Sequence, residues 1–354
     1  MLDKLILVGG FLGSGKTTLL AETARRLAKQ GKSVGLITND QAPELVDTRL
    51  LTGIGKGVSE VAGSCFCCNF NGFVDAVQSL DKQGAKIIIA EPVGSCTDLS
   101  ATIMNPLKKF HPDWNLAPLT VLVDPSRLPE IFGKTKSSVD PDALYIMQLQ
   151  LAEADRILVS KSDLLSDAEK KDAQTLLTKE YPGKRIGFLS SKTGEGFDSW
   201  LSDIQNDSDA GTTIVPVDYD RYAHGEAVLG WLNATATVAS NVDGKKLLND
   251  LLTAFHSEIK KSNSEVGHVK ATINVGSKEW TGNLTSLKGS VDVRETEAKP
   301  GSSLLILNAR VQMLPEALET LVRNLFKTLN LSVNSLRCLM PGRPNPTHRF
   351  SVQP

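Results

Sequence analysis

The chain has 354 residues, a length that predicts about two folded domains, and its 41% hydrophobic and 22% charged residues are typical of a globular protein with a sizeable core. The formal net charge of -1, from 39 basic and 40 acidic residues, argues against nucleic acid or an acidic membrane surface as a partner. No run of 18 apolar residues occurs, so we expect no transmembrane helix. The N-terminal MLDKLILVGG leads directly into a glycine-rich loop, and we expect a cytoplasmic protein.

Short apolar runs alternate with helical patterns over roughly the first 200 residues. The runs are rich in Ile, Val and Leu and show little alternation, which is typical of strands buried on both faces. With the helices between them, for example at 17–30 and 167–181, they predict an α/β P-loop domain over residues 1–207. Its sheet should be doubly wound and mostly parallel, with ligands at the carboxyl ends of the strands. The six runs are 5–10, 34–40, 86–92, 119–125, 156–163 and 185–191.

The second half of the chain has a different pattern. The polar segment 205–213 (QNDSDAGTT) predicts a linker. Beyond it we expect a smaller α+β domain over residues 208–354, with an antiparallel sheet and an irregular tail in PGRPNPTHRF. Its strands are predicted at 227–239, 268–275, 280–287 and 304–313, and its helices at 245–261 and 315–329.

The segment from Gly10 to Thr17 has the form G-x-x-x-x-G-K-T between a strand and a helix. Glycines let backbone N–H groups turn toward phosphate oxygens, and the helix N-terminus adds a positive dipole end. Lys16 is expected to reach the β- and γ-phosphates, the Thr17 hydroxyl to bind Mg²⁺, and Thr18 to support the α-phosphate. A glycine-rich turn without a ligand is the alternative. The predicted phosphate loop also includes Gly10, Gly13, Ser14 and Gly15.

A second motif, Ser160-Lys161-Ser162-Asp163, follows the run 156–163 and is close to N-K-x-D. A carboxylate at Asp163 can accept two hydrogen bonds from guanine, whereas adenine offers no such donor pair. The stem of Lys161 would cover the base, and Ser160 stands where an Asn is usual. Ser191 and Lys192, in SSKT, are expected beside the guanine oxygen. The alternative is an ordinary surface Lys-x-Asp sequence.

Glu91 and Gly94 follow the run 86–92 with the spacing of D-x-x-G. Glu91 would hold a Mg²⁺-bound water or orient the attacking water, and the Gly94 N–H would contact the γ-phosphate. Lys16 and Glu91 are therefore the catalytic candidates. Asp40, at the end of the run 34–40, is either a further Mg²⁺-side or switch residue or simply a helix cap.

Three cysteines, Cys65, Cys67 and Cys68, lie within four positions in a polar, glycine-flanked loop. Their thiolates would prefer Zn²⁺ or Cu(I) to Mg²⁺, and Co²⁺ or Ni²⁺ are also compatible. A fourth ligand would come from Asp40, Glu44, Glu60 or water. The alternative is a buried cysteine cluster or a redox pair.

In order, GGFLGSGKTTLL, ITNDQAPELVDT, AGSCFCCN, EPVGS, VDPSR and LAEADRILVSKSDL resemble the CobW-like P-loop GTPases, relatives of UreG and HypB. The resemblance covers about residues 1–200. It implies GTP and Mg²⁺, with Cys65, Cys67 and Cys68 as ligands of Zn²⁺, Co²⁺ or Ni²⁺ and Asp40 and Glu44 as nearby acids. It also implies delivery of a metal to a client metalloprotein, a corrinoid protein in some members.

This chain departs from that pattern in two respects. The histidine-rich stretch of many relatives is missing, since the five histidines at 111, 224, 256, 268 and 348 are all isolated. The second half is only loosely similar to the family's C-terminal domain. No Gln of the Ras type orients water, so we expect slow intrinsic hydrolysis. A homodimer is among the assemblies that the sequence allows. Two other functions are compatible with the motifs, a non-catalytic GTP-dependent scaffold and a P-loop ATPase or kinase.

Overall fold

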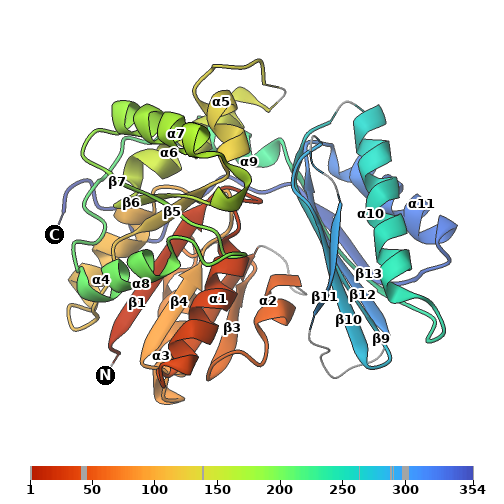
Figure 1. Ribbon diagram of the computed structural model, residues 1–354, viewed down its shortest axis with the longest axis horizontal. Coiled ribbons are helices and arrows are strands. Elements are labelled where there is room, and N and C mark those ends of the chain that lie inside the picture. The colour runs from red at the N-terminus through yellow and green to blue at the C-terminus, as the bar shows by residue number, and fades with distance from the viewer. Residues whose placement is uncertain are drawn as a thin grey trace.

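The computed structural model describes residues 2–40, 46–137, 139–262, 264–287, 289, 291–296 and 303–353, and at Asp40 and Ala62 only the backbone. Two sheets lie side by side, one surrounded by helices and one covered by helices on its outer face (Figure 1). The P-loop domain contains the first sheet and the C-terminal domain contains the second. The predicted division at residue 207 stays a prediction, and the two sheets fall on either side of it.

The first sheet has seven parallel strands in the order β3-β2-β4-β1-β5-β6-β7. Its central strand explains the unbroken apolar runs, because Leu5 and Leu7 enter one core cluster while Ile6 and Val8 enter another. Helices α3 and α6 pack on the first cluster, and helices α1 and α8 pack on the second. The strands are β1 (Lys4–Gly10), β2 (Val34–Asp40), β3 (Gly57–Ala62), β4 (Ile87–Glu91), β5 (Thr120–Val123), β6 (Arg156–Val159) and β7 (Arg185–Phe188).

The helices of this domain follow the strands along the chain. They are α1 (Lys16–Lys29), α2 (Val46–Leu51), α3 (Phe70–Lys82), α4 (Asn105–Phe110), α5 (Leu128–Ile131), α6 (Pro141–Glu153), α7 (Asp167–Glu180) and α8 (Phe197–Asn206), with a π-helical turn η1 (Ser100–Met104) before α4. None of the helices that the structure describes combines the length and apolar character needed to cross a membrane.

The second sheet has six antiparallel strands in the order β11-β10-β9-β12-β8-β13. Its strands are β8 (Gly230–Thr237), β9 (Val266–Val275), β10 (Lys278–Leu284), β11 (Asp292–Thr296), β12 (Leu304–Val311) and β13 (Ser332–Leu339). Helices α10 (Gly244–Lys261) and α11 (Pro315–Thr328) cover one face, and α9 (Tyr219–Ala227) precedes β8. The predicted fold class, a doubly wound parallel sheet with a smaller α+β domain, is confirmed.

The other face of the second sheet is polar, yet it is buried. Along β9, Val269 and Ala271 pack under the helices, whereas His268, Lys270 and Thr272 alternate with them; His268 and Thr272 are buried and Lys270 is half-buried. This polar face lies against the P-loop domain (Figure 1). The sheet therefore has two covers, its own helices and the neighbouring domain.

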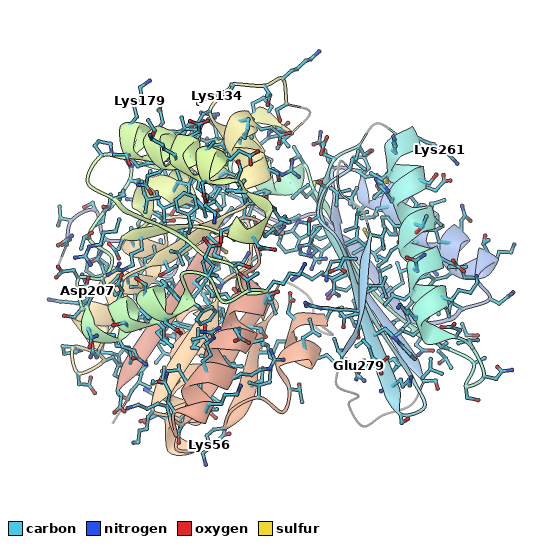
Figure 2. All side chains as sticks on the ribbon, in the orientation of Figure 1. Lys56, Lys134, Lys179, Asp207, Lys261 and Glu279 are labelled. Atoms are coloured by element: carbon cyan, nitrogen blue, oxygen red, sulfur yellow. The ribbon has the colours of Figure 1, made fainter. Side chains whose placement is uncertain are left out.

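Direct polar contacts join the two domains. Arg49 of α2 forms an ion pair with the fully buried Glu279 of β10 at 2.7 Å. Figure 2 shows Glu279 on the side of the C-terminal domain that faces the P-loop domain. The Asn308 side chain accepts a hydrogen bond of 2.8 Å from the backbone N–H of Val46. Helix α2 is thus the part of the P-loop domain most directly held by the second sheet.

The structure adds elements that the sequence did not predict. The edge strands β3 and β13 were not predicted, because each mixes polar and apolar residues. The predicted strand at 227–239 is shorter in the structure, because residue 227 still belongs to α9. The irregular C-terminal tail returns from the second sheet to the P-loop domain, where the chain ends (Figure 1).

Candidate functional site

The phosphate loop connects the end of β1 to the start of α1. Gly10, Gly13 and Gly15 have φ values of 130°, 78° and 97°, which disfavour residues with a Cβ. A Cβ at Gly10 would lie only 2.4 Å from the carbonyl oxygen of Leu122. The Ser14 hydroxyl is buried and has no hydrogen-bond partner among the described residues. The loop therefore offers backbone donors and one uncommitted hydroxyl, which fits a bound polyphosphate.

Lys16 is buried at the first turn of α1. Its ammonium donates hydrogen bonds to the carbonyl oxygens of Gly10 at 2.7 Å and of Phe11 at 3.1 Å. Burial lowers the pKa of Lys16 to about 8, although the nearby Glu91 carboxylate opposes that shift. A Cβ at Gly94 would lie 3.1 Å from the Lys16 nitrogen. The structure thus brings the predicted lysine and the predicted γ-phosphate glycine together.

Oxygen atoms from three elements converge beside Lys16. The Thr17 hydroxyl donates to one Glu91 oxygen at 3.2 Å, and the other Glu91 oxygen is buried with no partner among the described residues. Burial, with help from Asp47, raises the pKa of Glu91 to about 7. Lys270 of β9 reaches in from the C-terminal domain, donating to the two Asp47 oxygens at 2.6 and 2.8 Å and to the Thr17 hydroxyl at 3.3 Å. Sequence reasoning missed both Asp47 and Lys270.

This cluster fits Mg²⁺. The Thr17 hydroxyl, the unpartnered Glu91 oxygen and the Asp47 carboxylate form the hard, all-oxygen donor set that Mg²⁺ prefers. The Lys270 ammonium lies among the same oxygens. Burial alone would lower its pKa, but the Asp47 and Glu91 carboxylates outweigh that effect and raise it. Lys270 therefore remains charged and competes with a cation for this position.

A cavity of about 240 Å³ opens between the phosphate loop and the second sheet. Gly15, Lys16 and Thr17 line it from one side, and Lys270, Arg294 and Arg310 line it from the other. A neighbouring cavity of about 380 Å³ continues past Thr18 toward Ser191. The basic lining of the first cavity suits phosphate groups, and the second leads to the predicted base-binding loops.

The predicted base-binding residues lie after β6 and β7. Asp163 is exposed, and one of its oxygens accepts a hydrogen bond of 2.6 Å from Ser190. Lys161 pairs with Asp124, a residue that sequence reasoning missed, at 2.5 Å. Ser160 is buried, and its hydroxyl donates to the carbonyl oxygen of Val123 at 3.2 Å. The roles of Ser160, Lys161, Asp163, Ser191 and Lys192 in guanine binding stay predictions.

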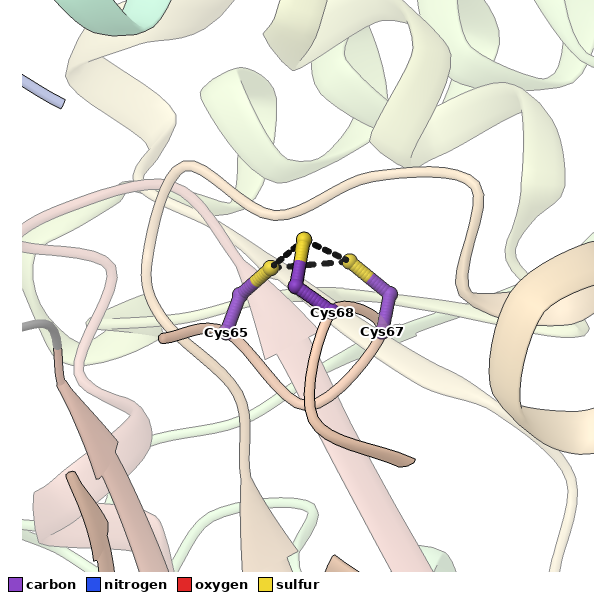
Figure 3. A group of neighbouring side chains, drawn as sticks. All are labelled: Cys65, Cys67 and Cys68. Carbon is purple, nitrogen blue, oxygen red and sulfur yellow. Dashed lines mark hydrogen bonds between the residues drawn. The ribbon is translucent and has the colours of Figure 1, made fainter. Parts of the chain in front are cut away.

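The three predicted thiol ligands lie in the loop between β3 and α3, and Figure 3 shows their sulfur atoms turned toward one another. The sulfur of Cys65 lies 2.8 Å from that of Cys67 and 3.1 Å from that of Cys68, and the third separation is 3.8 Å. Hydrogen bonds from these neighbours lower the pKa of Cys65, whereas the pKa of Cys67 is raised and that of Cys68 rises to about 11. Asn39, at the end of β2, holds the loop by bonding Val61, Ser64 and Phe66.

The predicted acidic ligands are less well defined. Glu44 lies outside the described residues, and Asp40 is described only by its backbone at the end of β2. Glu60 accepts a hydrogen bond of 2.5 Å from Thr48 and is thereby occupied. The assignment of Asp40 and Glu44 to a metal therefore stays a prediction.

The C-terminal tail lies across the thiol loop. The backbone N–H of Asn345 donates to the Cys68 sulfur at 3.2 Å, and that of Thr347 donates to the Cys67 carbonyl oxygen at 2.8 Å. Arg349 anchors the tail through an ion pair of 2.7 Å with the buried Asp98. The thiols are therefore covered by a segment that begins in the other domain, an arrangement without any local sequence signal.

The phosphate loop, the adjacent acid and the thiol triplet occur together on one parallel sheet, and the family model for the CobW/HypB/UreG nucleotide-binding domain matches residues 4–186. The chain belongs to this family. The match to the nucleotide-binding domain of this family confirms the predicted family.

Two relatives, one of them compared both by sequence and by structure, illustrate the similarity. The zinc chaperone YjiA of Escherichia coli is 26% identical over 169 residues, which are 46% of this chain. The match covers 51% of YjiA, so the chain spans about half the length of this curated relative. A crystal structure of Zn(II)-bound YjiA from E. coli has 16% identity and a TM-score of 0.37, covering 93% of this chain and 99% of that one. The hydrogenase maturation factor HypB of Archaeoglobus fulgidus has 18% identity and a TM-score of 0.39, covering 56% and 86%.

Proposed function

We propose that this chain is a Mg²⁺-dependent GTPase that carries a metal ion on Cys65, Cys67 and Cys68 and delivers it to a client metalloprotein. The observation that carries the proposal is the position of the two sites. The thiol loop and the phosphate-binding cluster both extend from carboxyl ends of one parallel sheet, and Asp47 lies on the chain between β2 and the thiol-bearing loop after β3. A structural change at the bound nucleotide can therefore reach the thiols through the short chain segment that carries Asp47.

Hydrolysis would use residues that the structure already brings together. Lys16 is the cation placed to bind the phosphates, and Gly94 lies against it. Thr17 would hold Mg²⁺, which supplies positive charge to the phosphate oxygens when bound, and Glu91 would act through a water on Mg²⁺ or through the attacking water. With a pKa near 7, Glu91 can accept a proton from an attacking water at neutral pH. Asp163 would select guanine through two hydrogen bonds.

Lys270 provides the link to the second domain. Its ammonium would have to leave the oxygens of Thr17 and Asp47 for Mg²⁺ to bind there, which would break one of the polar contacts between the domains. The tail over the thiols continues from β13 of that same domain. Binding of Mg²⁺ and GTP would therefore loosen the cover of the thiol cluster, and access to the metal would depend on the nucleotide.

The thiol ligands favour a soft or borderline ion. Zn²⁺ fits best, in keeping with the relative described as a zinc chaperone, and Co²⁺ or Ni²⁺ would also bind. The client is a metalloprotein, with a corrinoid protein as one candidate. Whether the carrier works as a homodimer is a separate prediction.

The test compares GTP turnover and bound metal in the wild type, in Cys67→Ala and in Cys338→Ser, which removes a half-buried thiol on β13. The proposal predicts bound Zn²⁺ and Zn²⁺-sensitive hydrolysis in the wild type and in Cys338→Ser, and loss of both in Cys67→Ala. Equal metal content in all three proteins would remove the thiol site from the account. GTP binding without multiple turnover would instead favour a non-catalytic switch, and equal affinity for ATP and GTP would favour an ATPase or kinase.

A further inference from the structure

The C-terminal domain touches the phosphate loop itself. A Cβ placed on Gly13 would lie 3.1 Å from the Thr285 side chain and 3.3 Å from the carbonyl oxygen of Gly267. A Cβ placed on Gly267 would in turn lie 2.8 Å from the Leu12 side chain. The cavity of about 240 Å³ beside Lys16 therefore has one wall from each domain, and these walls meet at the phosphate loop. A triphosphate bound there would have protein on both sides.

The lining of this cavity contains more cations than acids. Five Lys and Arg side chains line it, against three Asp and Glu side chains. One of the three acids, Glu91, has its pKa raised to about 7 by burial, so it is only partly ionised at neutral pH. Among the described residues that line the cavity, the positive charge thus exceeds the negative charge, which favours a phosphate chain as the ligand.

Arg294, on the edge strand β11, differs from the other cations of this lining. Lys16 and Arg310 donate hydrogen bonds to backbone carbonyl oxygens. Lys161 and Lys270 form ion pairs with carboxylates. The guanidinium of Arg294 is exposed and forms neither an ion pair nor a hydrogen bond within the part of the chain that the structure describes. It is therefore the cation of this lining that a ligand can engage without displacing another partner.

Arg294 lies where two cavities meet. Of the described residues, only Thr17, Thr18 and Arg294 line both the cavity beside the phosphate loop and the cavity of about 380 Å³ that continues from it. The two threonines belong to the first turn of α1, and Arg294 belongs to the opposite wall. Arg294 also pairs in register with Thr281, a buried residue on the polar face of the second sheet. Since paired residues of antiparallel strands point to the same face, Arg294 points toward the P-loop domain.

Two further side chains of the same wall lack partners. The Nδ1 atom of His268 and the indole nitrogen of Trp231 are buried, and neither has a hydrogen-bond partner among the described residues. Both residues line the cavity beside the phosphate loop. Buried polar groups in native proteins are nearly always hydrogen-bonded, so these two nitrogens indicate a ligand at this wall. This observation is independent of Arg294 and points to the same cavity.

We propose that Arg294 is a catalytic residue of GTP hydrolysis, a cation that the C-terminal domain supplies to the phosphates from the side opposite the phosphate loop. This inference rests on the proposed function as a GTPase. In hydrolysis, a water oxygen bonds to the γ-phosphorus while the bond from that phosphorus to the β–γ bridging oxygen breaks. The electron pair stays on the bridging oxygen, and the proton of the water passes to Glu91 and from there to solvent. The products are GDP and inorganic phosphate.

The guanidinium of Arg294 would act on the charge that this step creates. Negative charge increases on the bridging oxygen and on the other β-phosphate oxygens as the bond breaks. A cation held against these oxygens stabilises the transition state more than the bound GTP. Arginine suits this role because its guanidinium stays charged and presents several N–H donors in one plane.

The place of Arg294 in the sheet agrees with the proposed release of the tail. The strand β11 is one edge of the second sheet, and β13, from which the tail continues, is the other edge. Lys270 lies between them on β9. A contact between Arg294 and the phosphates would hold the β11 edge, while loss of the Lys270 contacts would free the strands nearer the tail. Hydrolysis and access to the thiols would thus depend on the same domain.

The experiment measures single-turnover GTP hydrolysis at saturating GTP and Mg²⁺ in the full-length wild type, Arg294→Ala and the control Arg337→Ala. Arg337 is an exposed arginine on the opposite edge strand, outside both cavities. Arginine residues in this role contribute about 10³–10⁵-fold to kcat, so Arg294→Ala should hydrolyse GTP about 10³-fold more slowly, with a far smaller change in GDP affinity. Added guanidinium ions should restore part of the rate in Arg294→Ala alone. Arg337→Ala should match the wild type.

Binding of GDP with aluminium fluoride, which mimics the phosphoryl group in transfer, gives a second measurement that needs no turnover. The wild type should bind GDP more tightly with aluminium fluoride than without it, and Arg294→Ala should lose that gain. Equal hydrolysis rates in Arg294→Ala and the wild type would overturn the inference, as would a lower GDP affinity with an unchanged rate at saturating GTP. A wild type that hydrolyses no GTP would instead refute the proposed function, so the two failures are distinguishable.

Discussion

Replacing Lys270 with Met tests whether the C-terminal domain competes with Mg²⁺ for the phosphate site. The Lys270 ammonium lies between both Asp47 oxygens, at 2.6 and 2.8 Å, and the Thr17 hydroxyl, at 3.3 Å. Methionine keeps most of the length of the side chain and removes the charge. If Lys270 must leave before Mg²⁺ can bind, the variant should bind Mg²⁺ and GTP more tightly than the wild type.

The size of the effect follows from the contacts that are lost. Hydrogen bonds to charged groups contribute about 1.5–3 kcal/mol, and both the ammonium and Asp47 are largely buried. Displacing Lys270 costs at least that much, which corresponds to about 10- to 150-fold in apparent Mg²⁺ affinity. Without Mg²⁺ the variant should be less stable, because the Asp47 carboxylate is left buried without its main partner.

The assay is a Mg²⁺ titration of fluorescent GTP-analogue binding, with Lys278→Met as the control. Lys278 is an exposed lysine on β10 whose nearest ion-pair partner, Glu295, lies 3.9 Å away. Weaker Mg²⁺ or nucleotide binding in Lys270→Met would refute the competition, because it would show that Lys270 supports the phosphates. If Lys270→Met required the same Mg²⁺ concentration as the wild type, moving Lys270 and its domain away from the site would cost no free energy.

Three further predictions concern other parts of the two sites. Since burial raises the Glu91 pKa to about 7, the carboxylate form is fully populated only above that pH, and the rate of hydrolysis should fall as the pH drops through 7. Glu91→Gln should hydrolyse GTP slowly at every pH while still binding it, and a wild-type rate independent of pH would contradict this prediction. Asp163→Ala removes two charge-assisted hydrogen bonds to guanine and should lower the preference for GTP over ATP by about 10- to 100-fold. The preference is measured as the ratio of the two dissociation constants, and an unchanged ratio would show that other residues select the base. Arg349→Ala removes the ion pair with Asp98 and should increase the rate at which the thiol cluster reacts with a disulfide reagent. The control Arg323→Ala, which removes an exposed ion pair on α11, should leave that rate unchanged, and equal rates in the two variants would show that the tail does not protect the thiols.

The sequence predicts the P-loop domain well because its strands are buried on both faces and its motifs are local. Leu5 to Val8 form an unbroken apolar run whose members serve two cores, and only a parallel strand covered by helices explains that pattern. The phosphate loop, Glu91 and the thiol triplet each depend on spacings of a few residues. Their placement after strands then follows from the topology.

Contacts between distant segments could not be predicted in the same way. Asp47 and Lys270 are 223 positions apart. Asp47 lies in the segment ITNDQAPELVDT, but no spacing there distinguishes it from the other acids, and Lys270 belongs to no motif. The alternation of His268, Lys270 and Thr272 with apolar neighbours on β9 is visible in the sequence, but such alternation usually indicates a strand with one face exposed to solvent. Only the packing of a second domain turns that face into a buried one.

The central claim is that the nucleotide controls the metal held by the thiols. The most direct test is the Zn²⁺ affinity of the wild type, measured by chelator competition with GDP and with a non-hydrolysable GTP analogue in saturating Mg²⁺. Coupling between two sites in one protein is typically 1–3 kcal/mol, so the account predicts affinities that differ by about fivefold or more between the two nucleotides. Equal Zn²⁺ affinity in the two states would contradict it.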